Sequence, residues 1–284
     1  MNYTLKSLNI MPKFGIGTWC MGEIDKEAQK EAEAIFFALE NGVRLIDTAE
    51  MYGEGKAESI IGDALKIANI NRKELFIVSK VYPHNAGRDK LFKSLEGSLK
   101  RIGLNYLDMY LLHWRGRIPL SETVECMEEA KKEGLIKDWG VSNFDIDDMK
   151  ELETIKDGDK CTVNQVLYHL GSRGVDYSLA PYMEERNIAL MAYCPLAQAG
   201  GLGKDILKNK TLLSIAKKHN AAPSQIALAF IMSFNNKIAI PKSSNKKHII
   251  ENIESQKIKL DDEDIALINK EFPKPNRKLA LDIV

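Results

Sequence analysis

The sequence predicts an α/β fold, a parallel (β/α)8 (TIM) barrel formed by a single domain. Eight short β-type runs alternate along the chain with amphipathic helical runs. Most of the strand runs are predominantly apolar, as expected for strands that are buried on both faces of a parallel sheet. Neither a linker-like nor a low-complexity segment divides the 284 residues, and barrels of this kind reach that length as one unit. We therefore expect one domain over residues 1–284.

Each element follows from its local pattern. In residues 26–41 the apolar positions recur at helical spacing, and the pair Asn41-Gly42 provides a stop. Pro223 begins a helix at a position where a missing N–H costs nothing. The expected strands are Phe14–Gly17, Arg44–Asp47, Leu75–Lys80, Leu107–His113, Ile136–Val141, Thr162–Gln165, Ala189–Tyr193 and Ile238–Pro241. The expected helices are Lys26–Asn41, Lys56–Ala68, Arg88–Arg101, Leu120–Glu133, Asp145–Thr154, Leu179–Arg186 and Pro223–Phe234.

Two segments lie outside the eightfold repeat. Leu5–Met11 precedes the first barrel strand, and we expect a short N-terminal hairpin there that closes the barrel floor. Ile265–Phe272 predicts an extra C-terminal helix, and the tail Pro273–Val284 is expected to fold over the barrel mouth.

The bulk composition narrows the function classes. The 40 basic residues balance 40 acidic ones, which disfavours nucleic acid or an anionic membrane as a partner. No apolar run reaches the roughly 18 residues of a membrane span, and Met1–Ile10 does not resemble a signal peptide. The four cysteines have no CxxC or metal-ligand spacing, so we expect a cytoplasmic protein without a metal site. Without an exposed apolar stripe, a monomer is expected.

Titratable residues stand at the ends of three successive strands. Asp47, Lys80 and His113 end apolar runs, and Tyr52 lies in the turn after the first of them. In such barrels the carboxyl ends of the strands build the active site. We therefore expect these four residues to meet at one rim and to be catalytic.

These residue types fit proton donation by a phenol. A free tyrosine has a pKa of about 10, and a neighbouring ammonium from Lys80 is expected to lower it. Asp47 would keep the buried Lys80 charged, and His113 would orient a substrate oxygen. A tuned Tyr52 could then protonate an oxyanion as a carbonyl is reduced. Since none of the four can deliver hydride, a cofactor is required.

Other interpretations of the same residues remain open. Asp47 and Lys80 could form a buried ion pair without chemistry. Lys80 could instead be the nucleophile of a Schiff-base enzyme. A cofactor-binding regulatory or sensor protein with little turnover would also retain the site.

The usual dinucleotide fingerprint GxGxxG is missing, so a nucleotide would be held differently. Residues 140–144 and Asn164-Gln165 place amides and a hydroxyl at two strand ends, where they suit a carboxamide. Tyr193 offers a ring face for stacking on a flat heterocycle. Residues 240–244, followed by Lys246, Lys247 and His248 at the start of a helix, predict a local phosphate site.

Eight short motifs recur along the chain in a recognisable order and spacing: Gly17-Thr18-Trp19, Asp47–Gly53, Ser79-Lys80, Leu111–Trp114, Gly140–Phe144, Asn164-Gln165, Tyr193–Leu196 and Ile240–Ser243. Through these motifs the chain resembles the aldo-keto reductases over essentially its whole length. Within the family it looks most similar to bacterial reductases of small aldehydes, including methylglyoxal, through residues 19–23 and 80–85.

The resemblance implies an NADPH-dependent reductase of small aldehydes or ketones, with NADH as a possible second cofactor. It implies Tyr52 as the proton donor, Asp47 and Lys80 as its tuning pair, and His113 as the orienting group. The cofactor contacts it implies are Gly17, Thr18, Trp19, Asp47, Ser142, Asn143, Gln165, Tyr193, Cys194, Leu196, Gln198, Pro241, Lys242, Ser243, Ser244, His248, Glu251 and Asn252. The substrate contacts it implies are Trp19, Tyr52, Tyr82, His113 and Trp114.

The chain departs from the family pattern at three places. His248 stands where many relatives that prefer NADPH carry an arginine, which weakens the expected preference over NADH. Arg115 replaces a frequent proline, and would favour carboxylate-bearing substrates if it turned into the pocket. The C-terminal tail is short, so an open pocket is expected. Cys20 and Cys194 lie near the expected site, where small buried residues are the simpler interpretation of both.

Overall fold

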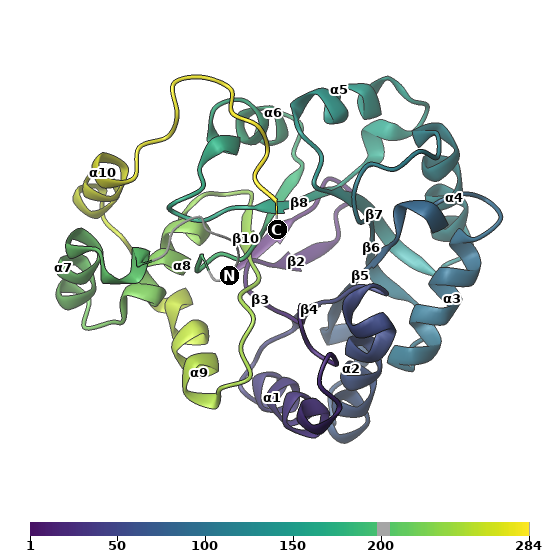
Figure 1. Cartoon of the computed structure of the whole chain (residues 1–284), viewed down its shortest axis with the longest axis horizontal. Coiled ribbons are helices and arrows are strands. Elements are labelled where there is room, and N and C mark those ends of the chain that lie inside the picture. The colour runs from purple at the N-terminus through teal and green to yellow at the C-terminus, as the bar shows by residue number, and fades with distance from the viewer. Residues whose placement is uncertain (198–204, 284) are drawn as a thin grey trace.

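A computed structural model describes residues 1–197 and 205–283. Within these residues, eight parallel strands form one sheet in the order β10-β9-β8-β7-β6-β5-β4-β3. The sheet closes between its first and last strands, because Phe14 pairs in parallel with Ala239 and the amide of Gly17 donates to the carbonyl of Pro241 at 3.1 Å. Helices surround the strands (Figure 1). The prediction of a (β/α)8 barrel is confirmed.

The elements lie close to their expected positions. The barrel strands are β3 (Gly15–Gly17), β4 (Leu45–Asp47), β5 (Phe76–Val81), β6 (Leu107–Leu112), β7 (Ile136–Ser142), β8 (Val163–Leu167), β9 (Ala189–Tyr193) and β10 (Lys237–Ala239). The α-helices are α1 (Ala28–Glu40), α2 (Lys56–Ile67), α3 (Leu91–Ile102), α4 (Leu120–Lys132), α5 (Ile146–Thr154), α6 (Leu179–Glu185), α7 (Lys210–Lys218), α8 (Pro223–Ser233), α9 (Lys246–Glu254) and α10 (Asp262–Glu271). Helix α7 was not among the expected elements.

The alternation of side chains along each strand separates two apolar layers. Residues such as Leu45, Val78 and Met109 point into the barrel and pack together, whereas Ile46 and Ile77 belong to the layer beneath the helices. Because successive side chains point to opposite faces, every second residue after these apolar ones also points inward. Asp47, Lys80 and His113 stand at such positions and therefore point into the barrel.

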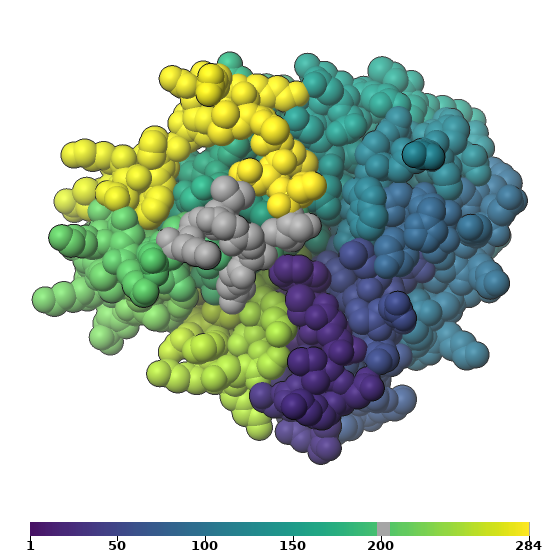
Figure 2. All heavy atoms as spheres, in the orientation of Figure 1, coloured from purple at the N-terminus to yellow at the C-terminus, as the bar shows by residue number. Residues whose placement is uncertain are grey.

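The expected hairpin and tail are both present. Strands β1 (Asn2–Thr4) and β2 (Ile10–Pro12) pair antiparallel, and Leu5 and Met11 pack with the barrel interior, so the hairpin plugs the floor. The C-terminal tail crosses one face of the molecule (Figure 2). Lys278 pairs with Asp145 at 3.2 Å, just after β7, which holds the tail over the carboxyl ends of the strands.

Between residues 1–197 and 205–283, no helix combines the length and hydrophobicity needed to cross a lipid bilayer.

Candidate active site

The four residues expected to be catalytic meet at the carboxyl end of the barrel. Asp47 ends β4, Lys80 lies in β5, and His113 directly follows β6. Tyr52 begins a short 3-10 turn, η2 (Tyr52–Gly55), between β4 and α2. The inward alternation of the three strands points Asp47, Lys80 and His113 to the barrel axis, and the turn returns Tyr52 to them.

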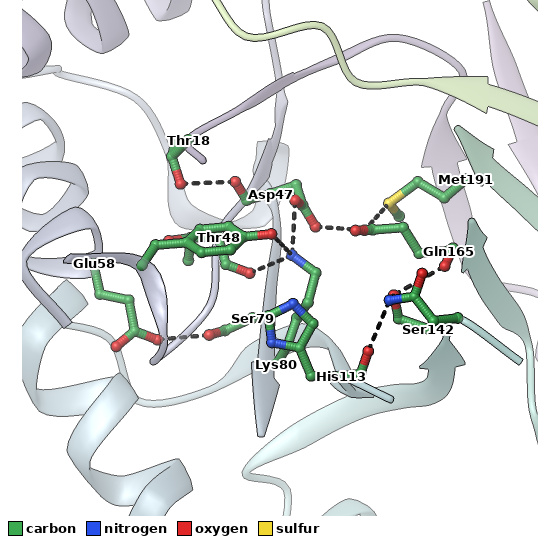
Figure 3. A network of polar contacts seen from close by, with 12 residues as sticks. Thr18, Asp47, Thr48, Glu58, Ser79, Lys80, His113, Ser142, Gln165 and Met191 are labelled. Atoms are coloured by element: carbon green, nitrogen blue, oxygen red, sulfur yellow. Dashed lines mark hydrogen bonds and ion pairs between the residues drawn. The ribbon is translucent and has the colours of Figure 1, made fainter. Parts of the chain in front are cut away.

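Lys80 is the centre of the contacts (Figure 3). Its ammonium donates to Oδ2 of Asp47 and to the carbonyl of Thr48, each at 2.8 Å, and to the Tyr52 hydroxyl at 3.1 Å. The Lys80 side chain is 0% exposed. Three acceptors thus satisfy the three donors of an ammonium that water cannot reach.

Burial dominates the electrostatics of this group. It raises the pKa of Asp47 and lowers the pKa of Lys80, while the ion pair between them opposes both shifts. Burial, followed by the charge of Asp47, raises the pKa of Tyr52 well above its ordinary value. The expectation of a lowered phenol pKa is therefore wrong for the protein by itself. Tyr52 stays protonated through the neutral range, as an acid must before it donates.

His113 is held in its neutral form. Burial, helped by the Lys80 ammonium, lowers the pKa of His113 to about 2. The imidazole stands edge-on to the Tyr52 ring, with 5.7 Å between ring centroids, and 4.9 Å from the Trp114 ring. A neutral imidazole can donate one N–H to a substrate oxygen, but it cannot serve as an imidazolium acid.

The turn that carries Tyr52 has an unusual backbone. Gly53, Glu54 and Gly55 have φ angles of 55°, 54° and 87°, all left-handed. A Cβ on Gly53 would lie 2.9 Å from the carbonyl oxygen of Met21, so the turn packs directly against the loop after β3. Glycine at positions 53 and 55 permits this conformation at little steric cost.

A cavity of ≈ 300 Å³ is lined by three of the four residues, Asp47, Tyr52 and His113, and Lys80 lies behind them. Most of its lining was expected from the sequence; Met51 was not expected there, and Ile240 was expected only as part of the phosphate segment 240–244. Tyr82 lies outside the lining and packs edge-on against Trp114 at 5.9 Å, so it supports the wall. The lining is Gly17, Trp19, Cys20, Asp47, Met51, Tyr52, His113, Trp114, Ser142, Asn143, Gln165, Tyr193, Cys194, Ile240 and Lys242.

A second hollow, of ≈ 170 Å³, shares Lys242 with the first. Its other lining residues are Leu196, Leu207, Ser224, Ser243, His248, Glu251 and Asn252. Asn245 caps α9 beside it, accepting from the amides of Lys247 and His248. Because both hollows include Lys242, they lie next to each other, and we call them together the trough. Its lining includes residues of β3 and β9, of the segment after β10, and of helices α8 and α9.

Three of the described residues expected at the cofactor lie outside both hollows. Thr18 is buried and donates to the carbonyl of Asp47 at 3.0 Å. Pro241 lines a smaller neighbouring hollow, and Ser244 lines neither part of the trough. Gln198 falls outside the described residues.

The amide groups at the barrel end form a connected set. Tyr193 donates its hydroxyl to Asn143 at 2.8 Å, and Asn143 donates to the carbonyl of His113 at 3.1 Å. Gln165 donates to Oδ1 of Asp47 at 2.7 Å, and Ser142 donates to the carbonyl of Gln165 at 2.9 Å. Hydrogen bonds therefore link the groups that suit a carboxamide to Asp47 of the Asp47–Lys80 ion pair and to the backbone of His113.

Arg115 points away from the cavity and pairs with Glu151 of α5 at 2.8 Å. It therefore offers no cation to a substrate carboxylate. Among the described residues, no three His, Cys, Asp or Glu side chains gather in a way that could hold a metal ion.

The chain is similar to known reductases along its length. The model of the aldo/keto reductase family matches residues 13–271. Methylglyoxal reductase YeaE of Escherichia coli K12 is 44% identical over 274 residues, which cover 96% of this chain and 95% of that protein. Glyoxal reductase of Bacillus subtilis is 35% identical, covering 91% and 88%. An aldo-keto reductase from Klebsiella pneumoniae, crystallised with NADPH, superposes with a TM-score of 0.94 at 41% identity, covering 100% and 99%. The chain therefore belongs to the aldo/keto reductase family.

Proposed function

We propose that this chain is an NADPH-dependent reductase that converts small 2-oxoaldehydes, such as methylglyoxal, to hydroxy compounds. The observation that carries the proposal is the 3.1 Å contact between the Lys80 ammonium and the Tyr52 hydroxyl at the end of a cavity. The similarity to methylglyoxal and glyoxal reductases supports the substrate class, and the NADPH-bound Klebsiella structure supports the cofactor.

The chemistry of the trough fits NADPH. Ser142, Asn143 and Gln165 would bind the nicotinamide carboxamide, and Tyr193 would stack on the ring, its hydroxyl fixed by Asn143. Lys242 lies between the two hollows, where a cation suits the phosphates. Ser243, His248, Glu251 and Asn252 would surround the adenosine end. When bound, the cofactor supplies the hydride for the carbonyl carbon.

Tyr52 supplies the proton in this proposal. Its hydroxyl donates to the carbonyl oxygen and transfers its proton as negative charge develops there. The Lys80 ammonium, already bonded to the phenol oxygen, stabilises the phenolate that remains. Asp47 keeps that ammonium charged in a buried site. His113, neutral because its pKa is about 2, donates one N–H to the same oxygen and orients the carbonyl.

The geometry disfavours a Schiff-base mechanism. A nucleophilic lysine needs a free, neutral amine, but Lys80 is fully buried and donates to three oxygen atoms. A sensor protein with little turnover has no specific observation in its favour, since the proton donor and the imidazole line one cavity and the ammonium bonds directly to the proton donor.

The cavity wall suits small uncharged substrates. Trp19, Met51 and Trp114 provide an apolar rim, and each is partly exposed. Because Arg115 is engaged by Glu151, we expect 2-oxoaldehydes to be preferred over 2-oxo acids. A cytoplasmic location and a monomeric state remain our predictions; the buried free thiols of Cys126 and Cys161 are compatible with a reducing compartment.

A substrate panel tests the proposal. Methylglyoxal, phenylglyoxal and glyoxylate are each assayed with NADPH and with NADH by the loss of absorbance of the reduced nicotinamide. We expect turnover of the two aldehydes with NADPH and a much lower kcat/KM for glyoxylate. Tight NADPH binding without multiple turnover on any aldehyde would contradict the proposal and favour the sensor interpretation.

A further inference from the structure

We propose that the ion pair of the buried Glu58 and the partly exposed Arg101 is a positioning device that sets the Tyr52 hydroxyl against the Lys80 ammonium. The inference rests on the proposed function, because it takes Tyr52 and Lys80 as the reacting pair. Neither Glu58 nor Arg101 lines the cavity. Both lie behind the barrel wall, where they contact the two segments that carry the pair.

Glu58 fixes the Lys80 side of the arrangement. It lies in the first turn of α2 and is 0% exposed. Its Oε1 accepts from the Ser79 hydroxyl at 2.5 Å, and its Oε2 accepts from Nε of Arg101 at 2.6 Å (Figure 3 shows the Ser79 contact). Ser79 directly precedes Lys80, and its side chain points outward as that of Lys80 points inward. The carboxylate therefore holds β5 from outside at the residue next to the ammonium.

Arg101 fixes the Tyr52 side. Its side chain comes from the last turn of α3 and lies against Gly55, the final residue of the turn that Tyr52 begins. A Cβ on Gly55 would lie 2.6 Å from Nε and 2.7 Å from Cδ of Arg101. Arg101 also donates to the Ser98 hydroxyl at 3.3 Å, within its own helix. Arg101 thus limits the space at Gly55, and the Met21 carbonyl limits the space at Gly53, two residues earlier in the same turn.

The Glu58–Arg101 ion pair therefore contacts both segments: Glu58 binds β5 next to Lys80, and Arg101 lies against the turn that Tyr52 begins. Three consecutive left-handed residues give the Tyr52 turn little intrinsic preference for its observed shape, so its neighbours must hold it. If the guanidinium is lost, the turn gains room on the Gly55 side and the 3.1 Å contact of Tyr52 with Lys80 loosens. Misplacement of a reacting group by about 1 Å can cost roughly 100-fold in rate. The cofactor contacts, and the substrate contacts other than Met51 and Tyr52, come from other segments and are left in place.

The alternative is that the pair merely ties α2, α3 and β5 together. That role predicts a loss of thermal stability, with kcat unchanged in whatever protein remains folded. The positioning role predicts a lower kcat in folded protein that binds NADPH normally. The two roles therefore separate when kcat, KM, NADPH affinity and Tm are measured on the same samples.

The experiment compares Arg101→Met, Arg101→Lys and the wild type with methylglyoxal and NADPH. We expect Arg101→Met to lower kcat by about 10- to 100-fold, with KM and the Kd for NADPH within about twofold of the wild type. Arg101→Lys retains the charge and most of the bulk, and should recover at least a third of the lost activity on a logarithmic scale. Arg88→Met is the matched control, because Arg88 pairs with Glu125 and Glu129 at the surface beside the same helix. It should leave kcat unchanged.

A wild-type kcat in folded Arg101→Met overturns the inference, as does a fall in kcat that is matched by an equal loss of NADPH affinity. If Arg101→Met does not fold, Ser79→Ala decides. It removes only the hydroxyl contact with Glu58 and should lower kcat several-fold without changing KM; an unchanged kcat overturns the inference. Tyr52→Phe distinguishes a failure of the proposed function from a failure of the positioning role. A Tyr52→Phe enzyme that keeps its rate contradicts the proposed function, whereas an inactive Tyr52→Phe beside a fully active Arg101→Met contradicts the positioning role alone.

Discussion

His113 should make the folded protein less stable in mild acid, by an amount that follows from its burial. The pKa of His113 is lowered to about 2, whereas a histidine in an unfolded chain titrates near 6.5. Between these values the unfolded state binds one more proton than the folded state, so a falling pH favours unfolding. Each pH unit below about 6.5 contributes roughly 1.4 kcal/mol. From about pH 7.5 to about pH 5, this one side chain therefore lowers the free energy of unfolding by about 2 kcal/mol.

His113→Asn removes the titrating group and tests this value. Urea unfolding of the wild type and the variant, followed by far-UV circular dichroism, gives the free energy of unfolding at both pH values. The wild type should lose about 2 kcal/mol more than the variant between them. His169, whose pKa burial also lowers, is present in both proteins and contributes equally to both.

An equal pH dependence in the two proteins would refute the reasoning. It would mean that His113 takes up its proton in the folded state near neutrality. His113 could then be an imidazolium during catalysis, and its assigned role as a neutral hydrogen-bond donor would fail.

Three further predictions concern the ammonium and the cofactor trough. Lys80→Met should lower kcat about 10- to 150-fold, the worth of a charged hydrogen bond of roughly 1.5–3 kcal/mol, in steady-state assays with NADPH; a loss below threefold would contradict it. In the wild type, kcat should decline at alkaline pH as Lys80, whose pKa burial lowers, loses its proton, while Tyr52 remains protonated. A pH–rate profile that stays flat up to about pH 10 would exclude this assignment. Lys242→Ala should raise the Kd for NADPH, by less at high salt, in fluorescence titrations; an unchanged Kd would remove Lys242 from the trough.

The barrel could be predicted because short apolar runs give the positions of most of its strands. Three successive strands also end at the titratable residues Asp47, Lys80 and His113, which marks the end of the barrel that carries the site. Some element boundaries differ from the expected ones. Strand β10, for example, ends at Ala239, two residues before the expected end at Pro241. Helix α7 was missed although Asn209 caps it, accepting from the amides of Thr211 and Leu212. The helix has nine residues, so its apolar stripe is short, and the sequence shortly before it is rich in glycine.

The candidate site was predictable in its residues and not in its electrostatics. Residue types and spacing predicted that Tyr52 and Lys80 lie close together. The direction in which the pKa of Tyr52 shifts depends on how deeply the phenol is buried, which cannot be read from the sequence. The family match confirms the resemblance, and the individual roles stay predictions. Glu58 and Arg101 were invisible, because Ser79 and Arg101 stand 21 and 43 positions from Glu58 and only the fold joins them.

The most direct test of the central claim is the rate of Tyr52→Phe. The substitution removes one oxygen atom and leaves the ring beside His113. If the phenol is the proton donor, kcat for methylglyoxal should fall by about 100-fold or more, while the Kd for NADPH stays within about twofold of the wild type. A variant that binds NADPH and retains most of the wild-type kcat would show that the proton comes from elsewhere.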